Sequence, residues 1–402
     1  MEISAHASPG RTPPWSTLAA AACGLCAIAL VLAYQTTLVH RLDHNNWTVL
    51  FCTGANIRVP PTLAFEHIHQ IPKSDGYDGE FYHYIAHDPF LTRGFASCID
   101  APRVRYQRIL LPLFAYALAL GRDRFIDRAY FTVNLVFVFL GTYWLSRYCS
   151  NQARSPAWGL AFIVIPAVLV SNDRMTVDGV LTSLCVAFLL YSSEGSNRRL
   201  YLCLALAALT RETGLLLIVA YCWWLLSKRR LKAAIVFGTS ALPALAWYAF
   251  VFLHTRPDHA KFISYPFSGL TTRLLHPTHY HLSPALSALA IAGDYLALSA
   301  IVLALLLSLR LAIDRTYDPR AFAIYLFALL TIFLANEGVW VELIAYSRSL
   351  TPLLLFLAAI ALCESRVVRR LMFAAPLAAV TLPLLGARTM FLLKLAPSML
   401  RP

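Results

Sequence analysis

The chain has 402 residues, of which 58% are hydrophobic and 14% are charged. A typical soluble domain carries about 25% charged and about 45–50% apolar residues. A water-soluble chain of this size could not bury so much apolar surface, so the composition excludes a cytosolic enzyme, a disordered protein and a disulfide-rich secreted scaffold. It predicts an all-α polytopic membrane protein. The net charge of +13 fits cytoplasmic positive charge and contact with anionic lipid, and the sequence offers no basic, aromatic-rich stripe for nucleic acid.

The first predicted element is an apolar stretch over residues 15–39. It is too long for a signal-peptide core and no A-x-A cleavage site follows it, so we expect an uncleaved first transmembrane helix. A mostly polar stretch comes next, at residues 40–128, and contains a short amphipathic run at 109–120. Ten further apolar stretches of spanning or near-spanning length follow at about 129–147, 157–171, 178–193, 200–210, 213–227, 233–253, 286–310, 321–335, 349–363 and 371–386.

The distribution of Lys and Arg predicts the orientation of these helices. With the N-terminus in the cytoplasm, every short cytoplasmic connection carries at least two positive charges, as in Lys228, Arg229, Arg230 and Lys232. Residues 109–120 then lie in the outer interface, because counting them as a span would place that basic turn outside. The result is a single transmembrane domain over residues 1–402 with about eleven spanning helices. Its main outer loops are residues 40–128 and 254–285.

Cysteine and histidine patterns give no clear metal site. The one Cys-x-x-Cys pair, Cys23 and Cys26, lies inside the apolar stretch 15–39 and is most simply explained as small core residues, and His276, His279 and His281 lie in a stretch without helical or strand order. We therefore assign no metal ligands, although a divalent cation stays an open possibility. A disulfide between Cys52 and Cys98 is permitted if the first outer loop faces an oxidising compartment.

The densest group of polar and aromatic side chains lies in the first outer loop, in Ser74-Asp75-Gly76-Tyr77-Asp78-Gly79-Glu80-Phe81-Tyr82-His83-Tyr84. A carboxylate held at the membrane surface beside aromatic rings suits proton abstraction from a hydroxyl, and the rings suit stacking on sugars. We take Asp78 as the candidate catalytic base, with Glu80 as the alternative. The candidate substrate-binding residues here are Tyr77, Tyr82 and His83. A plainer explanation is that the two carboxylates only form a turn and a helix N-cap.

Three further places put charge next to apolar stretches, where ionisable groups usually face a cavity or each other. Arg211 and Glu212 separate two short apolar runs, and Arg211 could bind an anionic head group such as phosphate. Arg348 enters the helix that contains Pro352 and, with Glu212, is a candidate substrate-binding residue, because anions are favoured at a helix N-terminus; snorkelling of Arg348 to lipid head groups is the alternative. The outer turn at 172–178 supplies Asp173 and Asp178 as candidate substrate-binding residues, and an N-cap role explains the latter equally well.

With these features together, the chain resembles the GT-C superfamily of integral-membrane glycosyltransferases, and within it bacterial relatives of the mannosyltransferases. The resemblance lies in the architecture and in local motifs: Asp78 in the first outer loop, 106–113 as a second interface helix, Arg211, and Arg348 with Pro352. The spacing here is Asp-Gly-Glu, whereas members of the superfamily often carry an Asp-x-Asp or Asp-Glu pair. The resemblance implies a polyprenyl-phosphate-linked sugar as donor, a glycan, lipid or protein as acceptor, and an active site on the periplasmic side of a bacterial inner membrane.

Under this hypothesis Asp78 accepts the proton of an acceptor hydroxyl as that oxygen attacks the anomeric carbon, and arginines offset charge on the departing phosphate. Two other classes stay open. A transporter or flippase for lipid-linked sugars would favour ionisable residues near the bilayer midplane and repeated halves, and no repeat is evident. A membrane acyltransferase would need a committed histidine, for which His83 and His87 are the pair spaced to share a helix face.

Overall fold

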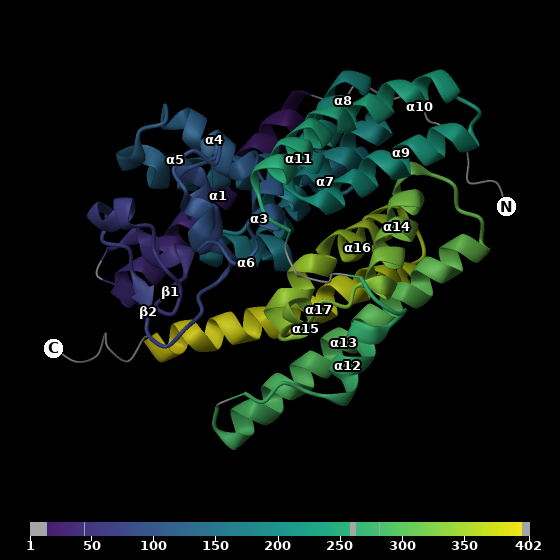
Figure 1. Cartoon of the computed structure of the whole chain (residues 1–402). Helices are drawn as coiled ribbons and strands as arrows, with labels where there is room; N and C mark the ends of the chain where they lie inside the picture. Colours follow the sequence, from purple (N-terminus) through teal and green to yellow (C-terminus); the bar gives the residue numbers. More distant parts are fainter. Residues whose placement is uncertain (1–13, 44, 258–262, 281, 396–402) are drawn as a thin grey trace.

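The computed structural model describes residues 14–43, 45–257, 263–280 and 282–395 (Figure 1). Three parts of the sequence-based predictions fall outside these residues. They are the first 13 residues, whose side of the membrane was predicted, residues 258–262 of the second outer loop, and His281.

Helices account for nearly all the regular structure of the described residues, and this confirms the predicted all-α class. The α-helices are α1 (Pro14–Asp43), α2 (Asp78–His87), α3 (Pro102–Gln107), α4 (Leu110–Leu118), α5 (Asp123–Asn151), α6 (Pro166–Arg174), α7 (Asp178–Glu194), α8 (Asn197–Thr210), α9 (Leu215–Ser227), α10 (Leu231–Gly238), α11 (Leu242–His254), α12 (Ser268–Leu275), α13 (Pro284–Ile313), α14 (Pro319–Phe333), α15 (Glu337–Trp340), α16 (Leu343–Cys363) and α17 (Val367–Leu395). Six 3₁₀ helices join them: η1 (Trp47–Phe51), η2 (Pro61–Glu66), η3 (Phe95–Cys98), η4 (Pro156–Val164), η5 (Glu212–Gly214) and η6 (Thr239–Ala241). One two-stranded parallel sheet pairs β1 (Thr53–Gly54) with β2 (Gln70–Ile71).

Six helical segments of the described chain are long and apolar enough to cross a membrane: α1, α5, the continuous α10–α11 segment, α13, α16 and α17. The pair η4 and α6 makes a seventh if its 56° bend lies within one span. Two shorter apolar helices, 212–227 and 319–333, accompany them. The protein is therefore a multi-pass membrane protein.

The structure has fewer full-length spanning helices than the eleven apolar stretches suggested, because several of those stretches form short or broken helices. The stretch at 157–171 divides at Pro166, which cannot donate a backbone hydrogen bond and so ends the preceding helix. The stretches at 200–210 and 213–227 are separated by Arg211, whose backbone is extended (φ −160°, ψ 147°). Apolar composition fixes the environment of a segment, but not whether its helix is continuous.

The amphipathic run at 109–120 forms α4, a helix of nine residues. At 1.5 Å per residue it is about 14 Å long, too short to cross a hydrocarbon core of about 30 Å. Its length agrees with the prediction that this run does not span.

The segment between α1 and α5, which the sequence predicts to be the first outer loop, is an ordered layer built from β1, β2, η1–η3 and α2–α4, with α2 packed against α4 and α5. In Figure 1 this layer gathers on the left, near β1 and β2, while α8, α9 and α10 lie on the right. Cys52 and Cys98, which could have joined two parts of the loop, are both free thiols.

The packing of α6, α7 and α16 against one another positions the polar residues described next. The N-termini of α2 and α7 and the N-terminal half of α16 meet at one end of the helix bundle. Residues more than two hundred positions apart in the sequence therefore share one site.

Candidate active site

The turn that begins α2 is held by close backbone contacts. Gly76 adopts φ +70°, which favours glycine, and the buried carboxylate of Glu80 accepts a hydrogen bond from the backbone N–H of Gly54 at 3.0 Å. Gly79 lies against the carbonyl oxygen of Arg174, so close that a Cβ there would be 2.1 Å from it. These contacts fix the start of α2 against the end of α6. Asp78, the first residue of α2, consequently faces α7 and α16.

Asp178 is the first residue of α7, and its turn is held in a similar way. The Ser171 hydroxyl accepts a hydrogen bond from the backbone N–H of Gly179 at 2.8 Å and lies 2.8 Å from the Thr176 hydroxyl. Asp78 and Asp178 both stand at helix N-termini, where the helix dipole favours negative charge. The sequence therefore folds two carboxylates to the same end of the bundle.

The cationic partners come from a helix break and from a late helix. Arg211 lies between α8 and η5, in the extended residue that interrupts the apolar stretch, and Glu212 follows it. Arg348 lies near the start of α16. Pro352, one turn later, has no backbone N–H to donate to the carbonyl of Arg348, which loosens the helix at this point.

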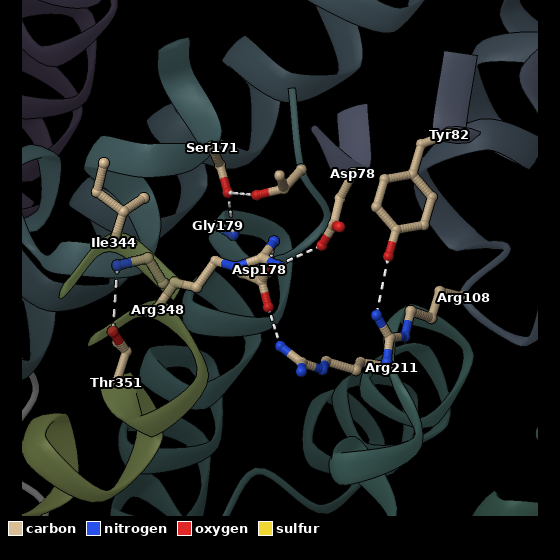
Figure 2. A network of polar contacts seen from close by, with 12 residues as sticks. Asp78, Tyr82, Arg108, Ser171, Asp178, Gly179, Arg211, Ile344, Arg348 and Thr351 are labelled. Atoms are coloured by element: carbon tan, nitrogen blue, oxygen red, sulfur yellow. Dashed lines mark hydrogen bonds and ion pairs between the residues drawn. The ribbon is translucent and has the colours of Figure 1, made fainter. Parts of the chain in front are cut away.

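The charged side chains of this region form one network, which we call the arginine–carboxylate cluster. Figure 2 labels five of its members: Asp78, Arg108, Asp178, Arg211 and Arg348. Its members are Asp78, Arg105, Arg108, Asp178, Arg211, Glu212 and Arg348. Arg348 bridges the two aspartates, because one guanidinium nitrogen binds Asp78 and another lies 3.1 Å from Asp178. Arg211 binds the other oxygen of Asp178 and lies 3.6 Å from Glu212.

Arg105 and Arg108 belong to the cluster, although sequence analysis did not select them. Arg105, on α3, lies 2.9 Å from Asp78 and also pairs with the half-exposed Asp100. Arg108 donates two hydrogen bonds to Glu212, at 2.9 and 2.7 Å. Arg105 lies in α3 and Arg108 caps its C-terminus, and their spacing of three residues is a detectable signal, since it places both side chains near one face of a short helix.

Two of the predicted substrate-binding tyrosines border the cluster. The Tyr77 ring lies between two guanidinium groups, 4.9 Å from that of Arg348 and 4.2 Å from that of Arg174. The Tyr82 hydroxyl accepts a hydrogen bond from Arg108 at 3.0 Å. Both aromatic side chains therefore contact arginines and help to orient them.

The cluster holds four guanidinium groups against three carboxylates, and all four arginine side chains are at most 12% exposed. Such dense, partly desolvated positive charge favours an anionic ligand, because arginine binds phosphate oxygens through two parallel hydrogen bonds. A ligand phosphate would compete with Asp178 for Arg211 and Arg348.

Asp78 and Glu80 have opposite electrostatic environments. Burial alone would raise the pKa of Asp78, but the charges of Arg105 and Arg348 lower it well below its usual range. Burial raises the pKa of Glu80 to about 8, and the hydrogen bond from Gly54 only partly opposes this shift. At neutral pH Asp78 is therefore an anion within the cluster, whereas Glu80 is mainly a neutral anchor of the turn.

The structure places three predicted site residues away from the cluster. The Glu80 carboxylate points to Gly54 and Gly76. Asp173 pairs with Arg388 of α17 at 2.6 Å. His83 is fully buried on α2, stacks on the Phe51 ring at 4.1 Å and lies beside two carboxylates.

A cavity of about 550 Å³ lies elsewhere, among the apolar side chains of α5, η4, α7, α16 and α17. Its lining includes Leu145, Trp158, Leu189 and Leu355, but no member of the arginine–carboxylate cluster. The reactive groups therefore have to be sought at the cluster and not in this cavity.

Comparison with known proteins decides the class of activity. A family model, glycosyltransferase family 87, matches residues 110–336, which is more than half of the chain. The chain belongs to glycosyltransferase family 87. This is a family of GT-C-type membrane glycosyltransferases, so the predicted superfamily is confirmed. No curated protein and no solved structure matches the chain.

Membership of family 87 makes this protein a membrane glycosyltransferase with a sugar donor and an acceptor. The matched region contains Asp178, Arg211 and Glu212, whereas Asp78, Arg105 and Arg348 lie outside it. The family assignment therefore supports the reaction class and leaves the roles of individual residues to the geometry.

Proposed function

We propose that this family 87 enzyme transfers a hexose or pentose from a polyprenyl-phosphate-linked donor to an acceptor hydroxyl, with inversion of configuration and with Asp78 as general base. One observation carries the proposal. Asp78 lies in direct contact with Arg348, which also binds Asp178, so a reactive carboxylate and a phosphate-binding arginine share one site. The acceptor class, whether glycan, lipid or protein, follows from the family resemblance alone.

The arginines suit a lipid-phosphate leaving group. The donor is a phosphodiester with one negative charge, and its leaving phosphate gains a second charge as the bond to the anomeric carbon breaks. Arg211 and Arg348 would hold the phosphate and stabilise the charge that develops in the transition state. Because such a phosphate needs little protonation to depart, a single carboxylate suffices and no paired acid is required.

Asp78 supplies the remaining proton transfer. The acceptor oxygen attacks the anomeric carbon from the face opposite the phosphate, the carbon–oxygen bond to phosphate breaks, and the hydroxyl proton passes to Asp78. In the resting site Arg105 and Arg348 weaken Asp78 as a proton acceptor. A donor phosphate that draws Arg348 away would raise the basicity of Asp78, which couples donor binding to activation of the acceptor.

The positive-inside pattern supports a setting for this reaction. Turns such as 227–232 carry the positive charge expected of the cytoplasmic side, and the cluster lies at the opposite ends of the neighbouring helices. We therefore place the site at the periplasmic face of a bacterial inner membrane, where the product would enter the cell envelope.

The test compares three variants in a transfer assay with a polyprenyl-phosphate sugar and a hydroxyl acceptor. Asp78→Asn should lower kcat by about 10²–10⁴-fold, the range attributed to general-base catalysis. Arg348→Gln should mainly raise KM for the lipid donor. Asp75→Asn is the matched control. Asp75 lies three residues before Asp78, its side chain is exposed, and its carboxylate accepts a hydrogen bond from Asn56 at 2.9 Å.

Full activity of a folded Asp78→Asn enzyme would refute the assignment of the base. Movement of intact lipid-linked sugar across vesicles without a new glycosidic bond would instead indicate a flippase. The product is therefore identified by its linkage, by mass spectrometry, in addition to donor consumption.

A further inference from the structure

A second group of titratable side chains lies beside the active site and takes no part in the proposed reaction. His83 and His87 stand one turn apart on the same face of α2. Glu66, the last residue of η2, and Asp127, in the second turn of α5, face them. One ligand atom from each of these four residues lies within 4.8 Å of the other three.

The distances within the group, from 2.7 to 4.0 Å, lie on both sides of those in a four-coordinate metal site. His83 Nε2 lies 2.7 Å from Asp127 Oδ1 and 3.3 Å from Glu66 Oε2, and His87 Nε2 lies 3.1 Å from Glu66 Oε1 and 4.0 Å from Asp127. A tetrahedron of nitrogen and oxygen ligands about 2.0–2.2 Å from zinc has edges of about 3.3–3.6 Å. Small side-chain shifts would therefore open the group around an ion.

Among the described residues, the four atoms lie at ion-pair distances from one another but make no hydrogen bond of acceptable geometry. Both histidine side chains are completely buried, and the Nε2 atoms of His83 and His87 make no hydrogen bond of acceptable geometry, nor do Glu66 Oε2 and Asp127 Oδ1. Buried polar atoms are almost always satisfied, so four unsatisfied atoms that point to one place call for an explanation. A bound cation would satisfy all four.

The surroundings of His87 prepare it as a ligand. Its Nδ1 lies 2.9 Å from Asp123 Oδ1, and Arg93 neutralises that carboxylate through contacts of 2.6 and 3.0 Å. A carboxylate on Nδ1 fixes the proton there and leaves the Nε2 lone pair free for a metal, as in carboxylate–histidine–zinc arrangements. That lone pair faces Glu66 and Asp127, an unfavourable contact unless positive charge lies between them.

We infer that Glu66, His83, His87 and Asp127 form a structural site for a divalent transition metal ion of the zinc class. Imidazole nitrogens favour such ions over Ca²⁺ and Mg²⁺, which prefer all-oxygen sites with more ligands. Two neutral histidines and two carboxylates would balance the charge of the ion. Four protein ligands also leave no open position for substrate, which is typical of structural zinc sites.

The ion would have a positioning role, because it would join two other segments to α2. It would link η2 of the first outer loop and the long helix α5 to the helix that begins at Asp78. His83 lies five residues after Asp78, about 7.5 Å along the helix axis. The ion would thus fix the position of α2 without contacting the reacting groups. Its presence does not depend on the proposed reaction.

The experiment measures metal in the purified full-length protein after equilibration with zinc and removal of the excess. One zinc ion per chain is expected for the wild type, and loss of most of it for His87→Asn. His69→Asn is the matched control, because it removes a similar histidine–carboxylate contact, 2.7 Å from Asp43, outside the group. Wild-type protein without bound zinc, or equal zinc in all three proteins, would overturn the inference and indicate charged histidines paired with carboxylates.

A second measurement covers the case in which His87→Asn does not fold. Wild-type protein stripped with a chelator is titrated with Co²⁺, and the visible absorption of four-coordinate Co²⁺ should appear and saturate at one ion per chain. Asp123→Asn, which leaves the four ligands in place, should weaken this binding by about 10–100-fold. Absence of the absorption, or unchanged affinity in Asp123→Asn, would contradict the site. Zinc, but not magnesium, should restore the thermal stability of the stripped protein.

Discussion

At the scale of single residues, Asp78 and Glu80 show how position decides the chemistry of a carboxylate. Both lie in the first turn of α2, two residues apart. Asp78 contacts two guanidinium groups, whereas Glu80 contacts a backbone N–H in a buried turn. The first is held as an anion that can accept a proton when its arginines are drawn away, and the second serves to hold the turn.

The raised pKa of Glu80 gives a pH dependence with a definite sign. Its pKa of about 8 in the folded protein exceeds the ordinary value of 4.5, so the folded state binds the additional proton between these values. The contribution of Glu80 to the free energy of unfolding is therefore fully present below about pH 4.5. It is lost as the pH rises through 8. Glu80→Gln keeps the shape of the neutral form and should remove this loss.

The measurement is the thermal unfolding midpoint of wild type and Glu80→Gln in detergent, at pH 6 and pH 9. The variant should gain stability relative to wild type as the pH rises. If the unfolding midpoints of the two proteins differed by the same amount at pH 6 and at pH 9, Glu80 would already be ionised at neutral pH.

At the scale of secondary-structure elements, the decisive contact is between the start of α2 and the end of α6. Gly79 permits it, because its missing side chain lets the carbonyl of Arg174 approach. The same contact sets the direction of Asp78 toward α7 and α16. A change in this packing should therefore reduce stability and activity together.

We expect Gly79→Ala to destabilise the protein by about 1–3 kcal/mol, the usual cost of overpacking, and to lower transfer activity by moving Asp78. The added Cβ would meet backbone, which cannot rotate away. Gly238→Ala is the matched control, because Gly238 has helical dihedral angles and open space around its Cα. Unfolding midpoints and kcat of both variants check this, and equal behaviour of the two would contradict the tight α2–α6 contact.

At the scale of the whole molecule, the active site depends on helices that are distant in sequence. Arg348 reaches Asp78 across 270 positions and Asp178 across 170. The buried ends of α2, α7 and α16 can meet only when the whole bundle is assembled. Substitutions in the packing of α16 should therefore affect catalysis, even where no substrate is touched.

The orientation of the bundle is testable with a membrane-impermeant thiol reagent on sealed cells. Asp75→Cys, in the first outer loop, should be labelled from outside, and Lys228→Cys, in the basic turn after α9, should be labelled only after the cells are opened. Both positions are exposed. Peptide-resolved mass spectrometry separates these sites from the native cysteines, and the reversed pattern would place the active site in the cytoplasm.

The sequence by itself determined the class of the protein and much of the candidate site. The scarcity of charge predicted a polytopic helical protein, the polar and aromatic segment at 74–84 pointed to Asp78, and ionisable residues beside apolar stretches pointed to Asp178, Arg211, Glu212 and Arg348. The inferences from the apolar stretches rest on the cost of burying a charge in an apolar environment, because charges that persist there usually have partners or a function.

Only the tertiary structure decided which of these residues meet. It joined Arg105 and Arg108 to the cluster, separated Asp173 and Glu80 from it, and gathered Glu66 and Asp127 around the two histidines of α2. It also showed that Pro166 interrupts an apolar stretch that resembles a continuous span, and that the backbone of Arg211 is extended between two helices. Hydropathy reports the solvent that each segment requires, but contacts between distant segments depend on side-chain packing across the assembled bundle, which no local pattern encodes.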